Sequence, residues 1–233
     1  MKKNTFWKNK NVFISGVAGF VGSNLAKNLV NNGSNVIGLT QNKKVNSLLY
    51  YEKIDKKINL IFDNITDKEL LNSIFLKYKI DICFHLAAQV EVGSASKYPY
   101  LTWETNVRGT YTLLESIREC KRKIKSIIIA SSDKAYGDYP LKSLPYKESY
   151  ELKPNYPYDT SKACADMIAK SYAYKLYKLP IIITRFANIY GCGQLNFTAL
   201  IPDAIRSCLL NKKFSLRSNG EAIRDFIYID DIT

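Results

Sequence analysis

The sequence predicts an α/β fold, with a doubly wound parallel sheet followed by a partial second lobe. Apolar runs of strand length alternate with longer amphipathic stretches that have helical periodicity. The strand-like runs are apolar nearly throughout, as expected when helices cover both faces of a sheet. A chain that alternates between strand and helix in this way forms a parallel sheet with right-handed crossovers.

Six strands and four helices are expected before the pattern changes at Phe186. After that residue we expect a loop over 191–196, a helix over 197–210 and short strands over 214–216 and 226–229. Two domains, 1–186 and 187–233, are therefore predicted. The elements of the first, in order, are strand 11–15, helix 20–32, strand 35–39, strand 58–62, helix 67–78, strand 82–86, helix 100–120, strand 125–130, helix 158–179 and strand 180–186.

The composition is that of a folded chain. Of the 233 residues, 46% are hydrophobic, including 17 Tyr and 10 Phe, which is enough for one sizeable core and unlike a disordered segment. No apolar stretch approaches about 18 residues, so no transmembrane helix is predicted. The apolar run near the N-terminus holds three glycines and passes directly into a helical pattern, so no signal peptide is expected.

Several classes of function are disfavoured by the composition. Five scattered cysteines without a CxxC pair indicate reduced thiols and a cytoplasmic location. With one histidine and no cysteine cluster, no metal is expected. The net charge is +13, but the lysines are dispersed, without an arginine-rich or Lys/aromatic stripe. We therefore expect neither nucleic acid nor a membrane as a partner.

GVAGFVG, between the first strand and the first helix, carries Gly16, Gly19 and Gly22. Glycines at such positions permit a tight turn, let the backbone approach a pyrophosphate and let the helix pack on the strand. The N-terminus of the helix then presents free N–H groups and a positive dipole to the phosphates. The three glycines therefore predict dinucleotide binding.

The acid that usually holds the adenosine ribose is missing after the second strand. An Asp or Glu there is typical of NAD-binding proteins, but this chain continues from Leu39 with Thr40 and Gln41. Thr40 or Gln41 is able to hydrogen-bond the ribose, and Lys43 or Lys44 is able to tolerate a 2′-phosphate. NAD and NADP both stay open.

HLAAQ, at 85–89, ends the fourth strand. The small residues Ala87 and Ala88 let a flat cofactor lie close to the backbone. We interpret His85 as a partly buried histidine whose ring nitrogens have partners, and not as a catalytic group.

ASSDKAYG, at 130–137, places hydroxyls, an acid and a base at the carboxyl end of a strand, where ligands bind in this fold class. Tyr158 and Lys162 lie four residues apart on one face of the following helix. An ammonium beside a phenol lowers the pKa of the tyrosine, which makes Tyr158 a candidate general base. Because a tyrosine and a lysine at this spacing often occur by chance, the pair indicates a catalytic site only together with other motifs.

The motifs together resemble the extended short-chain dehydrogenase/reductase family, which has a Rossmann-type NAD(P)-binding domain. They are GxxGxxG after the first strand, HLAA after the fourth, a serine after the fifth and YxxxK on the next helix. Three more resemble its nucleotide-sugar epimerase/dehydratase branch, namely TNVRGTYTLLE (105–115), RFANIYG (185–191) and RDFIYIDD (224–231). The resemblance implies that 1–186 binds NAD(P) and that 187–233 begins a sugar-nucleotide lobe.

The residues after Ser132 distinguish subgroups of this branch. Epimerases that resemble this chain usually lack an acid/base pair there, and dTDP-glucose dehydratases carry Asp-Glu. CDP-glucose 4,6-dehydratases and some UDP-N-acetylglucosamine dehydratases carry Asp-Lys. Since this chain has Asp133 and Lys134, it resembles most the CDP-glucose 4,6-dehydratases, which are hydro-lyases of deoxysugar biosynthesis.

The resemblance implies a mechanism that uses bound NAD. Tyr158, its pKa lowered by Lys162 and by the positive charge of the cofactor, takes the proton of the sugar 4-hydroxyl during transient oxidation at C4. Ser132 hydrogen-bonds the C4 oxygen. Asp133 and Lys134 then assist loss of the C5 proton and of the C6 hydroxyl as water, which leads to CDP-4-keto-6-deoxyglucose. Which of these two residues is the acid and which the base stays open.

The resemblance also implies the rest of the site. Arg224 is expected to pair with the substrate pyrophosphate, because its forked donors suit phosphate oxygens. Asn106 is expected to be structural. The expected substrate contacts are Gln89, Ser132, Asn188, Asn196 and Arg224. The expected NAD contacts are Gly16, Gly19, Phe20, Val21, Gly22, Asn64, Ile65, Leu86, Ala87, Ala88, Tyr158, Lys162 and Ala187.

Three expectations concern the whole molecule. The family continues beyond the position of Thr233, so 187–233 is expected to be an incomplete lobe with uncovered apolar surface. Helices 100–120 and 158–179 resemble those that form the family's homodimer as a four-helix bundle. Two alternative functions stay open, a nucleotide-sugar 4-epimerase of the UDP-glucose type and a non-catalytic NAD(P)-binding protein. The intact Ser132, Tyr158 and Lys162 argue against the non-catalytic protein, because a protein that only binds NAD(P) needs none of them.

Overall fold

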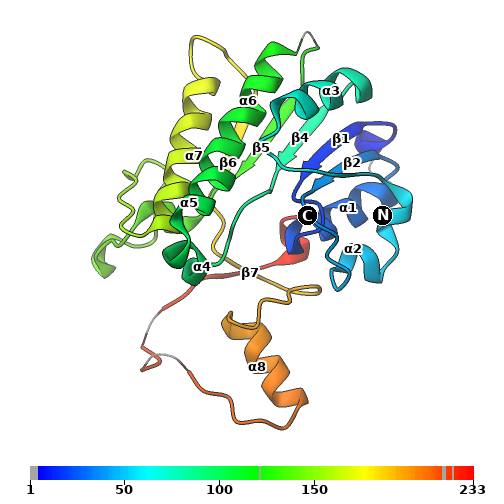
Figure 1. Ribbon diagram of the computed structural model, residues 1–233. Helices are drawn as coiled ribbons and strands as arrows, with labels where there is room; N and C mark the ends of the chain where they lie inside the picture. The colour runs from blue at the N-terminus through cyan, green and yellow to red at the C-terminus, as the bar shows by residue number, and fades with distance from the viewer. Residues whose placement is uncertain (1–4, 121, 217–218, 222) are drawn as a thin grey trace.

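Six parallel strands form one sheet in the computed structural model, which describes residues 5–120, 122–216, 219–221 and 223–233. The strand order is β3-β2-β1-β4-β5-β6, so the direction of winding reverses between β1 and β4 (Figure 1). The predicted doubly wound sheet is therefore confirmed. The strands are β1 (Asn11–Ser15), β2 (Asn35–Thr40), β3 (Asn59–Phe62), β4 (Ile82–His85), β5 (Ser126–Ala130) and β6 (Ile181–Thr184).

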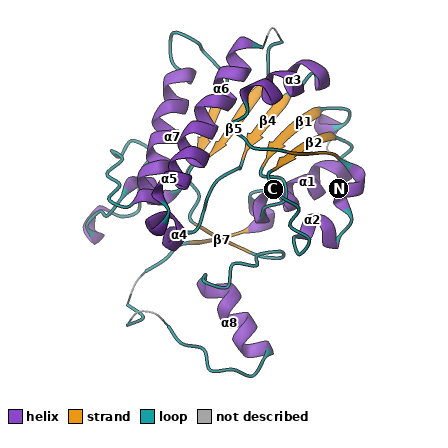
Figure 2. Cartoon of the chain, viewed as in Figure 1, coloured by secondary structure: helices purple, strands orange, loops and turns teal. Residues whose placement is uncertain are grey.

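Helices cover both faces of the sheet, as the apolar strands require (Figure 2). Successive strand residues point to opposite faces, so Phe13 packs with α3 and α6, whereas Val12 and Ile14 pack with α1 and α2. The helices on the first face are α3 (Lys68–Tyr78), α6 (Gly109–Glu119) and α7 (Pro157–Ala173), and those on the second are α1 (Phe20–Asn31) and α2 (Leu48–Tyr51). Two short helices, α4 (Val92–Lys97) and α5 (Pro99–Thr102), precede α6.

A π-helical segment, Trp103–Arg108, joins α5 to α6 and makes one helical stretch of the region predicted as helix 100–120. Asn106 lies in this segment and is 2% exposed. Its side chain exchanges hydrogen bonds with the backbone of Gln89, with distances of 2.8 and 3.0 Å, and donates to Ser161 Oγ at 2.8 Å. Asn106 thus ties the chain after β4 to α7, which is the structural role expected of it.

Several boundaries differ from those predicted. α7 ends at Ala173 instead of Leu179, because Pro180 disfavours helix in the residue before it and the chain must turn to enter β6. The stretch 214–216 is irregular, and no strand of the described chain pairs with it. A strand at β7 (Asn188–Tyr190) was not predicted; it pairs in parallel with β8 (Phe226–Tyr228).

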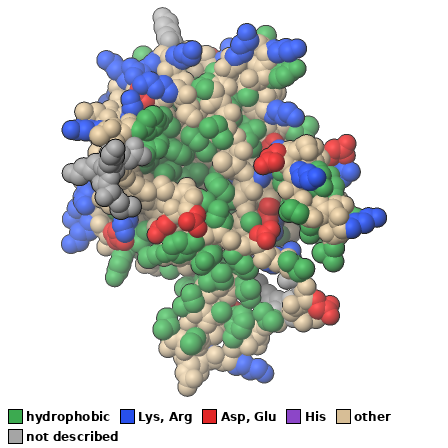
Figure 3. Space-filling view, turned by 180° about the vertical axis from the view of Figure 1, so that it is seen from behind, with side chains coloured by type: hydrophobic (Ala, Val, Ile, Leu, Met, Phe, Trp, Pro, Cys, Tyr) green, Lys and Arg blue, Asp and Glu red, His purple; other side chains and the backbone are tan. Residues whose placement is uncertain are grey.

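The segment after the sheet carries exposed apolar side chains. α8 (Leu200–Leu209) projects away from the main body in Figure 1, and hydrophobic side chains gather on this lobe in the view from behind (Figure 3). Leu200, Ile205 and Leu209 are 46%, 55% and 80% exposed. The uncovered apolar surface expected for 187–233 is present. Residues 1–4, 121, 217, 218 and 222 of the two predicted domains lie outside the described part. Among the described helices, none is long and apolar enough to cross a membrane.

A buried polar network joins β1, β4 and α6. Ser15 Oγ accepts the backbone N–H groups of Leu86 and Ala87, both at 3.2 Å, and lies 2.8 Å from His85 Nδ1. His85 Nε2 lies 3.0 Å from Thr110 Oγ1, which donates its own proton to a carbonyl of the π-helical segment. Thr110 therefore accepts from Nε2–H, and the imidazole is neutral. This confirms the interpretation of His85 as a buried histidine with partners on both nitrogens.

A second buried contact fixes the chain that leaves β5. Arg185, after β6, donates to both carboxylate oxygens of Asp166 at 2.7 and 3.0 Å. The same guanidinium donates to Tyr136 Oη at 2.9 Å and to the carbonyl of Glu148 at 3.2 Å. Asp166 is 1% exposed, so the pair holds the loop after residue 137 against α7.

We predict that the single histidine does not titrate in the folded protein near neutral pH. Burial, with a smaller effect of Lys162, lowers the pKa of His85 from 6.5 to about 3. The imidazole proton signals should therefore stay at their neutral position between about pH 8 and pH 5. Since the unfolded chain takes up the proton first, this residue's contribution to stability is complete above pH 6.5 and falls as the pH drops toward 3. A folded-state NMR titration with a midpoint near 6.5 would contradict this.

We predict that Asp166→Ala lowers the free energy of unfolding by about 3–5 kcal/mol, because it leaves the Arg185 guanidinium half-buried without its carboxylate. Urea unfolding of the purified chain measures this. Glu151→Ala is the matched control, since Glu151 pairs with Lys153 at 2.9 Å with both side chains more than half exposed. The control should change stability by less than about 1 kcal/mol. Equal effects of the two variants would refute the assignment.

Candidate functional site

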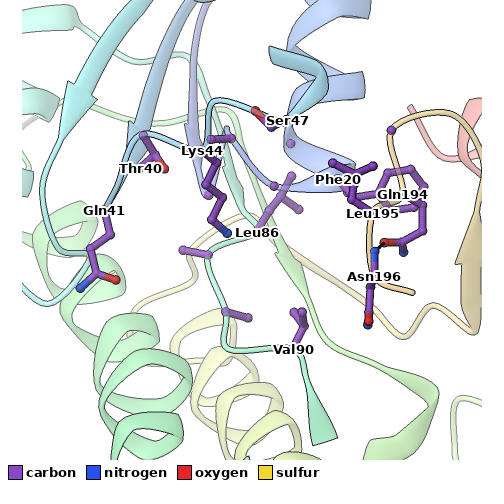
Figure 4. Close-up of a pocket in the computed structure, with 18 of the residues that line it drawn as sticks. Phe20, Thr40, Gln41, Lys44, Ser47, Leu86, Val90, Gln194, Leu195 and Asn196 are labelled. Carbon is purple, nitrogen blue, oxygen red and sulfur yellow. Dashed lines mark hydrogen bonds between the residues drawn. The ribbon is translucent and has the colours of Figure 1, made fainter. Parts of the chain in front are cut away.

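A cavity of about 810 Å³ opens at the carboxyl ends of the strands, beside the point where the strand order reverses (Figure 4). Its walls are the turn after β1, the loops after β2 and β3, the chain after β4, the end of β5, the start of α7 and the loop after β7. The predicted site residues that line it are Gly16, Gly19, Phe20, Val21, Gly22, Asn64, Ile65, Leu86, Ala87, Ala88, Ser132, Asp133, Lys134, Tyr158, Ala187, Asn188 and Asn196.

In the glycine turn, two glycines let neighbouring backbone segments come into close contact. Gly16 has φ +75°, and a Cβ on it would lie 2.8 Å from the backbone nitrogen of Ala87. A Cβ on Gly22 would lie 2.3 Å from the carbonyl oxygen of Gly16, so only glycine lets α1 pack on this turn. α1 starts with Gly19 as its N-cap and no side chain caps it. Its first N–H groups are therefore available to an anion in the cavity.

Ser132, Asp133 and Lys134 form one wall of the cavity directly after β5. Ser132 Oγ donates to Asp133 Oδ1 at 3.0 Å and accepts from the backbone N–H of Lys134 at 3.3 Å. The backbone N–H of Asp133 donates to the carbonyl of Phe186 at 3.1 Å, which joins this wall to the chain after β6. A hydroxyl and a carboxylate are thus held together at the end of a strand, and Lys134, the next residue, lines the same cavity.

Tyr158, in the first turn of α7, faces the same cavity and is 8% exposed. Burial raises the pKa of Tyr158 to about 12, against the opposing effect of a hydrogen bond with Ser132. The charges of Asp133 and Asp159 raise this pKa further. In the protein alone, the phenol therefore keeps its proton at neutral pH.

The expectation that Lys162 lowers the pKa of Tyr158 is wrong for the protein's own groups. Lys162 Nζ donates to the carbonyl oxygen of Ala130 at 2.8 Å, and Lys162 does not line the cavity. Burial lowers the pKa of Lys162 itself to about 8. The spacing places both residues on one helix face, as predicted, but Lys162 lies one turn further along, beside the end of β5. There the carbonyl of Ala130 accepts the hydrogen bond of its ammonium, a contact that no sequence pattern reveals.

Two predicted substrate contacts do not line the cavity. Gln89 Nε2 donates to the carbonyl of Glu91 at 3.1 Å, while Gln89 Oε1 is buried without a hydrogen-bond partner in the described structure. Arg224 is exposed, and its charge lowers the pKa of Tyr146, which burial raises. Asn188 does line the cavity and also donates to the carbonyl of Asp225 at 2.9 Å, so it holds the segment next to Arg224.

The loop after β7 closes one side of the cavity, and sequence reasoning missed part of it. Figure 4 shows Phe20 and Leu195 on the same side, with Gln194 Oε1 accepting the backbone N–H of Asn196 at 3.0 Å. A Cβ on Gly193 would lie 3.1 Å from Leu48 Cβ, so this loop rests on the start of α2. The glycines of GCGQLN were the available signal for a tight loop, but nothing in the sequence showed what it contacts.

Other lining residues were also not foreseen. The loop from 45 to 48 after β2, Val90 and Val92 after β4, and Thr105 in the π-helical segment all border the cavity. Two pairs of residues that the sequence did offer border the cavity too: Thr40 and Gln41 for the ribose, and Lys43 and Lys44 for a 2′-phosphate. Within the described ranges, no group of three or more His, Cys, Asp or Glu side chains is placed to hold a metal ion.

Known proteins show the same fold and related sequences. A family model described as GDP-mannose 4,6 dehydratase matches residues 13–233. The dTDP-D-glucose 4,6-dehydratase of Dictyostelium discoideum is 38% identical over 245 aligned positions, which take in 95% of this chain and 53% of that protein. The chain thus spans about half the length of this curated relative.

Solved structures agree with this relationship. The dTDP-glucose 4,6-dehydratase of Bacillus anthracis, in complex with NAD, superimposes with a TM-score of 0.83 at 30% identity, over 95% of this chain and 68% of that one. The UDP-glucose 4-epimerase of Thermotoga maritima, with UDP-glucose, gives a TM-score of 0.85 at 27% identity, over 95% and 70%. The resemblance to the nucleotide-sugar epimerase/dehydratase branch is confirmed, and since the family model covers nearly the whole sequence, this chain belongs to the GDP-mannose 4,6 dehydratase family.

Proposed function

We propose that the chain acts as a nucleotide-sugar 4,6-dehydratase that works with a nicotinamide dinucleotide. The observation that carries the proposal is that Ser132, Asp133, Lys134 and Tyr158 line the same cavity as the glycine turn. A serine and a tyrosine serve any reaction at a sugar 4-hydroxyl. An adjacent acid/base pair adds what removal of water requires.

The cavity suits a dinucleotide cofactor, and NAD is proposed because the Bacillus anthracis enzyme was crystallised with it. The glycine turn and the uncapped start of α1 would hold the pyrophosphate. Ala87 and Ala88 would let the flat nicotinamide end approach the backbone. When bound, the nicotinamide supplies a hydride acceptor for the sugar C4 and a hydride donor for C6.

Side chains of the protein itself are proposed to carry out the proton transfers. Tyr158 is proposed to take the proton of the 4-hydroxyl, and Ser132 to hydrogen-bond the C4 oxygen as it becomes a carbonyl. Because burial raises the pKa of Tyr158 to about 12, a positive charge must lie beside the phenol in the loaded site before it acts as a base. Asp133 and Lys134 are proposed to remove the C5 proton and to protonate the departing C6 hydroxyl.

The proposal also concerns which nucleotide the sugar substrate carries. The Asp133–Lys134 pair favours CDP-glucose by resemblance, whereas the Dictyostelium relative is named for dTDP-glucose. Arg224 and Asn196 are proposed to contact the substrate diphosphate. Arg224 is exposed and precedes Asp225, whose carbonyl accepts a hydrogen bond from the cavity-lining Asn188.

We predict that the protein with NAD removes one water from one nucleotide hexose, which mass spectrometry of the sugar nucleotide detects. CDP-glucose, dTDP-glucose, UDP-N-acetylglucosamine and GDP-mannose are the substrates to compare. In deuterated water the product should carry deuterium at C5, because the C5 proton is exchanged during elimination. A chain that binds the dinucleotide and a sugar nucleotide but yields no dehydrated product would refute the dehydratase assignment.

We predict that Asp133→Asn and Lys134→Ala each slow water loss by about a hundredfold or more, because each removes one proton-transfer group. Both variants should still bind NADH, since the glycine turn is untouched. Lys142→Ala is the matched control, because Lys142 is exposed and does not line the cavity. Rates from single-turnover mass spectrometry compare them, and unchanged rates in both site variants would argue that the pair only shapes the pocket.

A nucleotide-sugar 4-epimerase is the second candidate. The Thermotoga maritima epimerase supports it through a TM-score of 0.85. Its product has the same mass as the substrate, so the same mass spectra, combined with an NMR spectrum of the sugar, separate the two activities. A non-catalytic role would show as tight dinucleotide binding with neither product.

We also propose the homodimer that the resemblance implied, through the helical stretch 99–119 and α7. Large apolar side chains on these helices face solvent in the single chain, among them Tyr100 at 69%, Leu101 at 57% and Met167 at 63% exposure. Their burial against a second copy would remove an unfavourable surface. The mass of the protein in solution tests this arrangement.

A further inference from the structure

We propose that the edge of the sheet opposite the cavity binds a membrane surface that contains anionic phospholipids. Five segments form this edge, and each leads into one of the strands β1, β3, β4, β5 and β6. They are named together the basic edge and comprise residues 5–10, 55–58, 76–81, 122–125 and 174–180. This surface takes no part in the reaction proposed above, so the two proposals stand or fall separately.

The topology brings the five segments together. All six strands are parallel, so they begin at one edge of the sheet and end at the other, where the cavity lies. The backbone N–H of Asn11, which begins β1, donates to Asp81 Oδ2 at 3.0 Å, and the Asn11 side chain donates to the carbonyl of Lys79 at 3.3 Å. Arg122 and Lys125, before β5, pair with the same carboxylate at 3.1 and 3.3 Å. Segments far apart in the sequence thus meet around Asp81.

Positive charge greatly exceeds negative charge on the basic edge. Its described residues include two carboxylates, Asp55 and Asp81, and the side chain of Asp81 is 9% exposed and already paired. All of its cations except the partly exposed Lys10 are exposed to solvent, and Lys and Arg side chains line the top of the molecule in Figure 3. Most of the net charge of +13 therefore lies here. The cations are Lys8, Lys10, Lys56, Lys57, Lys77, Lys79, Arg122, Lys123, Lys125, Lys175 and Lys178.

Folding creates this concentration of charge. We expected no membrane partner because the lysines are dispersed along the sequence, but each βα unit returns the chain to the same edge before the next strand. A lysine near a helix C-terminus is favourable in itself, which accounts for Lys77 in the last turn of α3. Lys10, Lys123 and Lys125 lie beyond the last turn of any described α-helix, so the helix dipole does not account for them.

Large apolar side chains lie exposed among these cations. Leu76 and Leu176 are 81% and 79% exposed, and Tyr174 is 63% exposed. Leu76 directly precedes Lys77, and Lys175 lies between Tyr174 and Leu176. Surface segments that enter the headgroup region of a membrane combine such residues, because the apolar side chain reaches the acyl boundary while the ammonium stays at the phosphates. The basic edge therefore offers both contacts that peripheral binding requires.

The same features favour a phospholipid surface over a nucleic acid. Ten of the eleven cations are lysines, whose point charges suit a diffuse anionic surface, whereas the forked donors of arginine suit individual phosphates. Nucleic acids also bind through aromatic side chains that stack on bases. Tyr177 of the edge already stacks on Tyr172 at a centroid distance of 5.1 Å, and the guanidinium of Arg118 lies 5.4 Å from the centroid of its ring. Exposed leucines would gain little from a nucleic acid.

The test is the fraction of the full chain that co-sediments with lipid vesicles. Vesicles of phosphatidylcholine mixed with phosphatidylglycerol should bind the chain, whereas vesicles of phosphatidylcholine alone should bind little of it. Raising the salt concentration from about 0.1 M to about 1 M should release the bound chain, because the Debye length falls from about 10 Å to about 3 Å. No binding to the anionic vesicles would overturn the inference and leave the proposed function intact.

Neutralising three lysines of the basic edge locates the contact. The triple variant Lys57→Gln, Lys123→Gln and Lys175→Gln should weaken partition onto the anionic vesicles about a hundredfold, since each lysine near an anionic surface contributes about fivefold. All three side chains are exposed, and none pairs with a carboxylate of the described chain. Their replacement is therefore expected to leave the fold unchanged.

The matched control removes the same charge elsewhere. Lys97→Gln, Lys142→Gln and Lys147→Gln replace exposed lysines of α4 and of the loop after β5, outside the basic edge. Lys97 lies over the ring of Tyr98, with Nζ 5.2 Å from its centroid, much as Lys175 lies over Tyr174 at 5.5 Å. The control should weaken partition less than about fivefold. Equal loss in the two triple variants would show that only net charge matters and would overturn the assignment of the edge.

A further variant separates a phospholipid surface from a nucleic acid. Leu176→Ser should weaken binding to the anionic vesicles about fivefold, because it removes an apolar side chain from the acyl boundary. It should leave the release by salt unchanged. A chain that binds a DNA duplex more tightly than the anionic vesicles, with no effect of Leu176→Ser on either, would overturn the inference in favour of a nucleic acid.

Discussion

The contact between the ends of β1 and β4 is the constraint on which the site depends. Ser15 receives the two backbone N–H groups that follow β4, and His85 holds the same serine from the other side. The contact is so close that Gly16 has no room for a side chain. The glycine turn, which is proposed to hold the pyrophosphate, and the segment at 86–88 are thereby packed against each other as one unit. The rest of the cavity is assembled around it by the neighbouring strand ends.

Burial determines the charge state of the groups around this unit. It keeps His85 neutral, raises the pKa of Tyr158 to about 12 and lowers the pKa of Lys162 to about 8. The rim of the cavity is different, since the exposed Lys43 and Lys44 and the partly exposed Lys134 line it. His85 and Tyr158 are thus neutral near pH 7 and Lys162 keeps most of its charge, while the rim attracts anions. This division suits ligands that carry their charge on phosphates and their reacting atoms on an uncharged sugar.

The sequence predicted the parts of the structure that local patterns encode. All six strands of the sheet were placed within two residues of their observed bounds. The glycine turn and the serine, acid and lysine after β5 were located because each follows a recognisable apolar run. Such runs reflect burial on both faces and need no knowledge of the neighbours.

The errors concern contacts that only the folded chain defines. Lys162 was expected to act on Tyr158, but the carbonyl of Ala130, 32 residues away in sequence, accepts its hydrogen bond. The loop at 191–196 was correctly expected to be irregular, yet its place over α2 depends on the contact between Gly193 and Leu48. β7 was missed because it follows the predicted end of the sixth strand at Phe186 almost directly, and its pairing with β8 is a contact between residues far apart in the sequence. Contacts between residues that are far apart in the sequence leave no periodic pattern of apolar residues from which they could be predicted.

The order of the strands also has a consequence for folding. β1, β2 and β3 are joined by local crossovers, but β4 must return past them to pair with β1. The Ser15–His85 contact spans 70 residues, so it carries a large loop-closure cost and is expected to form after the local strand pairs. A partly folded chain with only β1 to β3 in place has the glycine turn but not the surface it faces. A dinucleotide would then bind only the fully wound sheet, and it would stabilise that state by mass action alone.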